Sequence, residues 1–319
     1  MFLTSLENVA LLLAMAIPGF IVAKLKMLKN PDGAINFISI LLLYICQPFI
    51  TFNSFLNTDY QQTVLFNLIA VFLVTAVIMV AVCSFSRLIL IKSKDSDVRS
   101  MIPYAATFGN VGYMCIPFLQ ILRPGDNLVI LYATASIVAF NLAAWTMGNY
   151  ILTRNKKFIS LKKAFFNPPT ISFLIALPLF MLNLNFNRSA SLQGVAKVCR
   201  LFAELVGPMS MTLLGIKFSE IRFKELLSDY RPYLSAGLKL ILAPFIAFCI
   251  LFITRIFYNI DAILLNVVAF AAMPTATNLM MFSSLHDKDV KLAAKIVLIS
   301  TLLSVLTIPL VLGLSRIVF

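Results

Sequence analysis

Charged residues and histidine are scarce in this chain of 319 residues. Asp, Glu, Lys and Arg make up 12% and hydrophobic residues 61%, whereas a soluble domain is about a quarter charged and about half apolar. There is one histidine, and no H-E-x-x-H, D-x-x-x-D or G-x-S-x-G pattern occurs. Metal catalysis needs several such ligands, and covalent catalysis needs a nucleophile with a base. The composition argues against an enzyme and for a membrane-embedded chain.

Paired cysteines are also missing. Cys46, Cys83, Cys115, Cys199 and Cys249 fall within apolar runs, and no two form a C-x-x-C pair. Disulfide frameworks and cysteine metal sites need matched spacings. We interpret all five as small packing residues and expect neither a metal nor a cofactor.

Long apolar runs dominate what the sequence does contain. A helix needs roughly 20 apolar residues to cross a hydrocarbon core of about 30 Å, and ten runs qualify. They lie at about 6–24, 33–56, 64–91, 99–121, 127–152, 169–186, 192–216, 232–256, 260–284 and 291–315. Runs of this length indicate helices rather than barrel strands. The predicted fold class is an all-α polytopic membrane protein with ten transmembrane helices.

Most of the basic residues behind the formal net charge of +13 lie in the loops between the predicted spans. Lys and Arg gather after every odd-numbered span, at 24–29, 87–99, 154–163, 217–231 and 288–295. By the positive-inside rule these loops are cytoplasmic, so both termini are predicted to be extracytoplasmic in the plasma membrane. The first span lacks a basic start and a cleavage site, which favours a retained helix over a signal peptide. The basic excess indicates orientation and contact with anionic lipid rather than nucleic-acid binding.

Proline positions indicate an internal repeat. Pro18 and Pro178 are 160 residues apart, as are Pro48 and Pro208, and we expect each to interrupt its span. Five spans per half is an odd number, so the second half would be inverted, as in many secondary transporters. The predicted units are a first five-helix repeat at 1–153, a cytoplasmic connector at 154–168 and a second, inverted repeat at 169–319.

Two predicted spans contain residues that break helices, 107-TFGNVGYMCIP-117 and 271-AAMPTATN-278. Proline removes a helix hydrogen bond and glycine relaxes the backbone, which is costly in hydrocarbon unless protein or water pairs the freed groups. A break that lines a cavity offers N–H groups and a positive helix end to an anion. Asn110 and Asn278 add donors and acceptors beside each break. Ordinary transmembrane kinks are the alternative.

These two segments resemble those of the auxin efflux carrier family, in the bile acid/sodium symporter superfamily, and the resemblance covers essentially the whole chain. It implies an inverted 5+5 repeat with broken helices 4 and 9 crossing near the membrane midplane. It also implies a scaffold of spans 1, 2, 6 and 7, against which a transport panel of spans 3–5 and 8–10 moves as an elevator. The implied activity is secondary transport of small organic anions such as malate, malonate or auxin-like acids. Two departures are Cys115, where many relatives carry glycine, and a short loop between spans 5 and 6.

The resemblance places the substrate at the crossing of helices 4 and 9. Together with the helix breaks and the repeat model, this gives the predicted substrate-binding residues: Gln47, Asn110, Val111, Gly112, Tyr113, Pro117, Pro274, Thr275, Thr277 and Asn278. Structural alternatives stay open for three of them. Gln47 could form a helix–helix hydrogen bond instead, and the two threonines could pair with backbone carbonyls freed by Pro274.

Ionisable groups inside spans are rare and costly. Glu204 lies one helical turn after Arg200, and is either a coupling carboxylate or half of a structural ion pair. Lys239 is expected to extend to the cytoplasmic interface. His286 is expected to be a solvated loop residue, and Trp145 a packing residue or interface anchor.

An anion channel or a ligand-sensing receptor on the same fold is the main alternative to a carrier. Channels usually show rings of charge or a filter loop, and neither is repeated here. Because spans 4 and 9 offer no carboxylate, we expect proton coupling or uniport rather than sodium coupling. The expected partners are a small organic anion and membrane lipid, and the resemblance makes a homodimer through the scaffold plausible.

Overall fold

The computed structural model of the chain describes residues 2–188, 192–220, 226 and 229–319. Regular structure within those residues is helical, apart from one isolated antiparallel bridge between Gly109 and Thr275. A helix satisfies its backbone hydrogen bonds within one segment, as a hydrocarbon environment requires. The all-α prediction is confirmed for the described residues.

Seven helical units in this part of the chain are long and apolar enough to cross a membrane. They are Phe2–Lys24 (α1, Phe2–Ala14; α2, Ile17–Lys24), Pro31–Leu56 (α3, Pro31–Leu41; η1, Leu42–Cys46; α4, Gln47–Leu56), Gln62–Leu90 (α5), Asn127–Thr153 (α8, Asn127–Ala143; η3, Ala144–Gly148; α9, Asn149–Thr153), Gln193–Ser219 (α12, Gln193–Glu204; α13, Val206–Ser219), Arg231–Phe257 (α15, Arg231–Gly237; η7, Leu238–Leu242; α16, Ala243–Phe257) and Val290–Val318 (α19). Each coincides with one of the ten predicted runs.

The three remaining runs are bent or broken. α11 (Pro168–Met181) is bent by 42° from the connector helices η4 (Lys156–Phe158) and α10 (Leu161–Phe165), and η5 (Phe186–Arg188) follows it. The run at 99–121 forms α6 (Ser96–Thr107), η2 (Val111–Cys115) and α7 (Ile116–Leu122), and the run at 260–284 forms α17 (Asp261–Ala272) and α18 (Asn278–Leu285). Both gaps fall at the glycine- and proline-containing motifs, as predicted.

The four paired prolines do not all interrupt a helix. Pro18 and Pro48 are in the first turns of α2 and α4, and Pro208 is in the first turn of α13. A first-turn proline removes no hydrogen bond that the helix would otherwise make. Pro178 lies inside α11, which continues to Met181. The interruption expected at Pro178 is therefore wrong.

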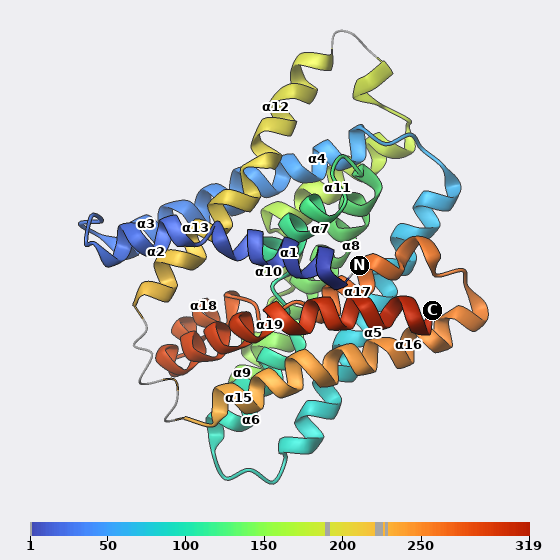
Figure 1. The fold of residues 1–319 in the computed structure, drawn as a ribbon. Helices are drawn as coiled ribbons and strands as arrows, with labels where there is room; N and C mark the ends of the chain where they lie inside the picture. Colours follow the sequence, from blue (N-terminus) through green and yellow to red (C-terminus); the bar gives the residue numbers. More distant parts are fainter. Residues whose placement is uncertain (1, 189–191, 221–225, 227–228) are drawn as a thin grey trace.

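Helices from both ends of the chain form two packed groups (Figure 1). In the first group, α2 packs against α13, and α4 packs against α11 and α12. In the second group, α5 packs against α6, α8 and α17, while α19 packs against α15, α17 and α18. The groups meet where α1 contacts α7 and α19, where α13 contacts η2 and α7, and where α8 contacts α4 and α11. Both broken helices belong to the second group, and one of them touches the first.

α2 and α13 cross in direct backbone contact. A Cβ atom on Gly19 would overlap the carbonyl oxygen of Thr212, and a Cβ atom on Gly215 would overlap that of Ala16. Small residues let membrane helices approach closely enough for such packing. The two glycines, one on each helix, therefore set the closest approach within the first group.

One ion-pair cluster links two basic loops. The Arg231 guanidinium lies 2.8 Å from the Asp229 carboxylate and 3.5 Å from that of Asp95, and so joins the start of α15 to the segment before α6. Two members of the predicted basic loop at 217–231, Arg222 and Lys224, lie outside the described residues.

All five cysteines are free. Four are buried, in agreement with the predicted packing role, whereas Cys249 is exposed on α16. Among the described residues, no group of three or more His, Cys, Asp or Glu could hold a metal ion.

Candidate functional site

The two helix breaks are hydrogen-bonded to each other. The Asn110 backbone N–H donates to the Pro274 carbonyl at 2.7 Å, and the Ala276 N–H donates to the Phe108 carbonyl at 2.9 Å. Gly109 and Thr275 form the antiparallel bridge between these bonds. We call residues 108–110 and 274–276 the paired break. Each broken helix supplies the partners that the other has lost, so the backbone cost of both interruptions is met within the protein.

Thr275 connects three elements at this point. Its hydroxyl donates to the Ala105 carbonyl of α6 at 3.1 Å, and its N–H donates to the Ser300 hydroxyl of α19 at 3.2 Å. The side chain is fully buried. Of the two roles left open for Thr275, the structure favours satisfaction of a carbonyl. That carbonyl belongs to the other broken helix rather than to the turn before Pro274. Thr277 is also buried, at the start of α18.

Two short helical segments begin at the paired break. η2 starts at Val111, where the Asn110 carbonyl accepts from the N–H groups of Met114 and Cys115 at 3.2 and 3.1 Å, and α18 starts at Asn278. The first N–H groups of a helix have no partner within it, and that end carries a partial positive charge. Two such ends therefore lie at one place in the second group.

A buried amide donor remains free beside them. The Asn110 side chain is 3% exposed, and its Nδ2 has no hydrogen-bond partner within the described residues. Buried side-chain donors are nearly always paired, so an unpaired one needs an explanation. Asn278 is half-buried on the first turn of α18. The structure thus keeps one predicted asparagine beside each break.

Residues of the first helix group pack against η2. The Gln47 side chain is 5% exposed, and a Cβ atom on Gly112 would lie 2.5 Å from its Nε2. From α13, the Ser210 hydroxyl donates to the Tyr113 carbonyl at 2.8 Å. Val111 is buried at 2% exposure. The structure therefore places Gln47 against Gly112 of the motif and adds Ser210, which carries no signal in the sequence.

Lys239 is buried at 1% exposure and does not extend to the membrane interface, so that prediction is wrong. A Cβ atom on Gly109 would lie 3.0 Å from Lys239 Nζ, which places the ammonium at the paired break. Lys239 lies in η7, a π-helical turn. The extra residue of a π turn changes which side chains face inward, and sequence periodicity does not reveal such a turn.

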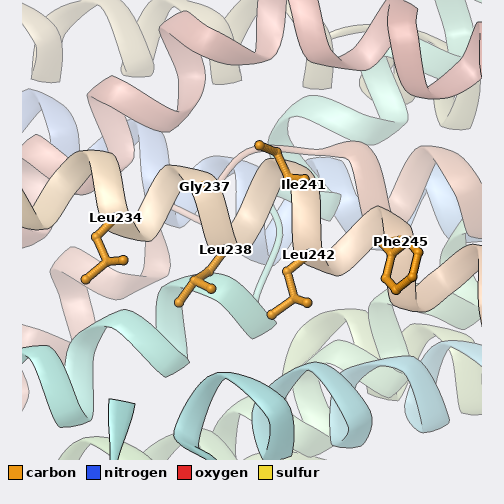
Figure 2. A pocket seen from close by; sticks show the side chains of 6 residues that line it. All are labelled: Leu234, Gly237, Leu238, Ile241, Leu242 and Phe245. Carbon is orange, nitrogen blue, oxygen red and sulfur yellow. The ribbon is translucent and has the colours of Figure 1, made fainter. Parts of the chain in front are cut away.

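The opposite face of the same helix is apolar. Leu234, Leu238, Leu242 and Phe245 lie along one side of it beside a groove of about 360 Å³, with Gly237 and Ile241 completing the lining (Figure 2). The groove offers no charged or hydrogen-bonding side chain for an anion, so it suits hydrocarbon contact better than solute binding.

A larger cavity of about 1110 Å³ lies where the two groups meet. Pro117, Gly207 and Pro208 are among its lining residues, and so are the charged residues Arg123, Asp126 and Lys197. A Cβ atom on Gly207 would lie 3.4 Å from the Cβ of Pro117, so the groups touch there. Pro117, predicted as a site residue, therefore lies between the motif and this cavity.

Glu204 lines the same cavity as half of an ion pair. Its Oε1 lies 2.8 Å from Arg200 Nε, with side chains that are 55% and 74% exposed respectively. Exposed pairs of this kind contribute little and stay in contact with solvent. Of the two interpretations of Glu204, this geometry favours the structural pair.

His286 is half-buried rather than solvated, which corrects the prediction. Its Nε2 lies 3.0 Å from Asn149 Oδ1, and its ring packs edge-on against Phe158 with 4.8 Å between centroids. The Phe282 ring is nearly parallel to the imidazole, with 6.4 Å between centroids, and packs edge-on against Trp145. Of the two roles predicted for Trp145, packing residue or interface anchor, this geometry favours packing. The connector region and the end of α18 share one aromatic cluster.

We expect His286→Gln to flatten the pH dependence of stability. Burial lowers the pKa of His286 and the Lys163 ammonium lowers it further, against an opposing effect of the Asp287 carboxylate. An unfolded histidine titrates near pH 6.5. The neutral, half-buried imidazole therefore contributes its full share of folding stability above that pH, and this share is lost as the pH falls through the lower folded-state pKa. Thermal unfolding in detergent between about pH 8 and pH 5 measures it. Equal decreases in midpoint for variant and wild type would contradict the expectation.

A family model described as membrane transport protein matches the chain twice, over residues 4–159 and again over residues 152–312. No curated protein matches the chain. Because the two matches together extend over almost all of its length, the chain belongs to this membrane transport family, the auxin efflux carrier type that its two motifs resemble.

Proposed function

We propose that this membrane transporter carries small organic anions, carboxylates such as malate, malonate or auxin-like acids, and binds them at the paired break. The observation that carries the substrate class is the common starting point of η2 and α18 beside the unpaired Nδ2 of Asn110. Helix starts favour negative charge, and a buried amide donor favours an acceptor. A carboxylate meets both requirements with one group.

The cavity between the helix groups supplies the route to this site. It extends from Arg123 and Lys197 to Pro117, seven residues along the chain from Asn110. The charged residues of the lining are Arg123, Lys197 and Arg200 against Asp126 and Glu204, and a positive excess raises the local concentration of anions. We place the predicted ligand set, including Gln47, Tyr113 and Asn278, at the inner end of this route.

Alternating access would follow from movement of the second helix group against the first, as an elevator. The contacts across the boundary near the site include Gln47 against Gly112, Gly207 against Pro117, and the Ser210 hydroxyl on the Tyr113 carbonyl. The paired break lies wholly within the second group. A bound anion would therefore travel with that group while these boundary contacts break and re-form.

The proposed topology has ten crossings in an inverted 5+5 repeat, with units at 1–153 and 169–319 joined by a cytoplasmic connector at 154–168. The two broken helices occupy the fourth and ninth positions. Both termini would be outside the cytoplasm of a plasma membrane, because the basic loops face the other side. We also propose a homodimer through the first helix group.

Uniport or proton coupling is proposed over sodium coupling. The two motifs at the breaks, 107–117 and 271–278, contain no Asp or Glu. Glu204 stays a candidate for proton coupling, although its exposed pair with Arg200 makes it a weak one. The sodium dependence of anion binding decides between these modes.

Thermal unfolding of the purified full chain tests the proposal. The panel contains malate, malonate, succinate, citrate, a bile acid and indole-3-acetate, each with sodium or potassium. Binding at a hundred times Kd raises stability by about 2.7 kcal/mol, and Asn110→Ala is expected to remove most of that shift. Asn141→Ala is the matched control, since its buried Nδ2 is also unpaired but lies on α8, outside the predicted ligand set.

No shift with any carboxylate, in protein that unfolds cooperatively, would reject an organic anion as the substrate. An anion channel or ligand-sensing receptor on this fold is the alternative. Saturable flux in proteoliposomes supports the carrier, whereas large single-channel currents would establish the channel.

A further inference from the structure

Lys239 is the feature of the site that the proposed function does not yet explain. Lys239 is only 1% exposed, yet no ion pair or hydrogen bond of its side chain occurs within the described residues. The Cys115 thiol of η2 is the titratable neighbour that acts on its charge. A buried ammonium without an acidic partner is costly, and intramembrane charges are kept mainly where a ligand or pathway uses them.

The described residues around Lys239 offer hydrogen-bond donors but no acidic partner. Ser235 and Ala243, one turn away in each direction, are buried small residues, and the Ser235 hydroxyl has no partner. The Asn110 Nδ2 is likewise unpaired. The Ser235 hydroxyl and the Asn110 amide are therefore two buried donors without an acceptor among the described residues, and Lys239 adds a cation without an ion-pair partner.

We propose that the Lys239 ammonium is the charged group that binds the substrate carboxylate at the paired break. The proposal rests on the proposed function and deepens it. The two helix starts supply partial charge, and Lys239 supplies a full one within reach of Gly109. A charge-assisted hydrogen bond in a buried site is stronger than a neutral one.

A fixed cation at this position also removes a requirement for a bound metal cation. Sodium in an anion carrier can offset the substrate's charge, and here the protein itself carries that charge on Lys239. Anion binding by this chain should therefore be the same in sodium and in potassium. The site suits one carboxylate group directly, and any second carboxylate of the substrate would have to face another part of the cavity.

A structural role for Lys239 is the competing explanation. A Cβ atom on Gly109 would lie 3.2 Å from the Phe270 carbonyl as well as 3.0 Å from Lys239 Nζ, so the ammonium is near the carboxyl end of α17. Cations stabilise that end of a helix. Loss of the cation would then destabilise the protein without altering the affinity for anions.

Calorimetric titration of the purified full chain separates the two roles. Each carboxylate of the panel, malonate first, is titrated as its sodium and its potassium salt into wild type, Lys239→Met, Lys239→Arg and Lys92→Met. Lys92 is an exposed loop lysine after α5 and serves as the matched control. Methionine retains the length of the side chain without its charge, so the variant is expected to fold.

Lys239→Met should weaken carboxylate binding about 10- to 100-fold, the effect of losing a charge-assisted hydrogen bond. Lys239→Arg should retain more affinity than Lys239→Met, Lys92→Met should match wild type, and exchange of sodium for potassium should change nothing. Equal affinities for Lys239→Met and wild type would overturn the assignment while leaving the carrier proposal intact. Binding that requires sodium would overturn it too. If wild type binds no carboxylate, the proposed function fails, and the assignment fails with it.

Discussion

Gly215→Ala is expected to destabilise the protein more than any other single methyl addition to a glycine of the first helix group. The added Cβ would overlap the Ala16 carbonyl oxygen and lie 2.8 Å from the Phe20 nitrogen, two atoms that form a hydrogen bond of 3.0 Å within the α1–α2 unit. Overpacking typically costs about 1–3 kcal/mol, and a contact with backbone cannot be relieved by a rotamer change. Thermal unfolding in detergent measures the loss, which we expect at or above the top of that range.

Gly19→Ala tests the same crossing from the other helix, since its Cβ would overlap the Thr212 carbonyl. Gly313→Ala in α19 is the control, because nothing lies within 4 Å of the added atom. In an open helical position alanine is more favourable than glycine by up to about 1 kcal/mol. We expect the control to leave stability unchanged or raised. A similar loss in all three variants would show that the α2–α13 contact is not the cause.

Thr275→Val should impair both stability and anion binding. Valine matches the shape of threonine but cannot donate to the Ala105 carbonyl, 3.1 Å from the hydroxyl in a fully buried position. An unsatisfied buried acceptor costs about 1–3 kcal/mol. The same hydrogen bond holds α6 against the other broken helix, so its loss also disturbs the geometry of both helix starts. Thermal unfolding with and without malonate measures the two effects together.

Thr301→Val provides the matched control. Thr301 is also fully buried, but its hydroxyl donates to the Val297 carbonyl four residues earlier in α19. That carbonyl already belongs to the helix ladder, so the substitution leaves no acceptor without a partner and should cost less than about 1 kcal/mol. Equal losses of stability and of malonate binding in the two valine variants would show that the hydrogen bond between Thr275 and Ala105 has no particular importance.

Much of the fold is predictable from local properties of the sequence. Apolar runs longer than about 20 residues must be helices in hydrocarbon, and seven of the ten predicted runs are long helices in the structure. The glycines and prolines of the two motifs place both breaks correctly, at 108–110 and 273–277. Pro178 shows the limit of such reasoning, because tertiary packing keeps α11 helical through a proline that favours a break.

Within the site, the sequence offered candidate residues but not their hydrogen-bond partners. Gln47 lies against Gly112 and the Asn110 amide has an unpaired donor, while their ligand-binding role stays a prediction. Thr275 is engaged with Ala105, in the other broken helix 170 residues away. Such a partner cannot be found from spacing along the chain.

Composition and periodicity by themselves determined that this chain is helical, membrane-embedded and broken in two places, because those properties depend on each segment's own preference for hydrocarbon and on its own backbone. Only the tertiary structure decided that the two breaks bond to each other and that His286 is packed rather than solvated. It also decided that Lys239 faces Gly109 instead of the membrane surface. The direction of a side chain depends on a π turn and on what the neighbouring helices leave room for, and that information is spread over residues far apart in the chain.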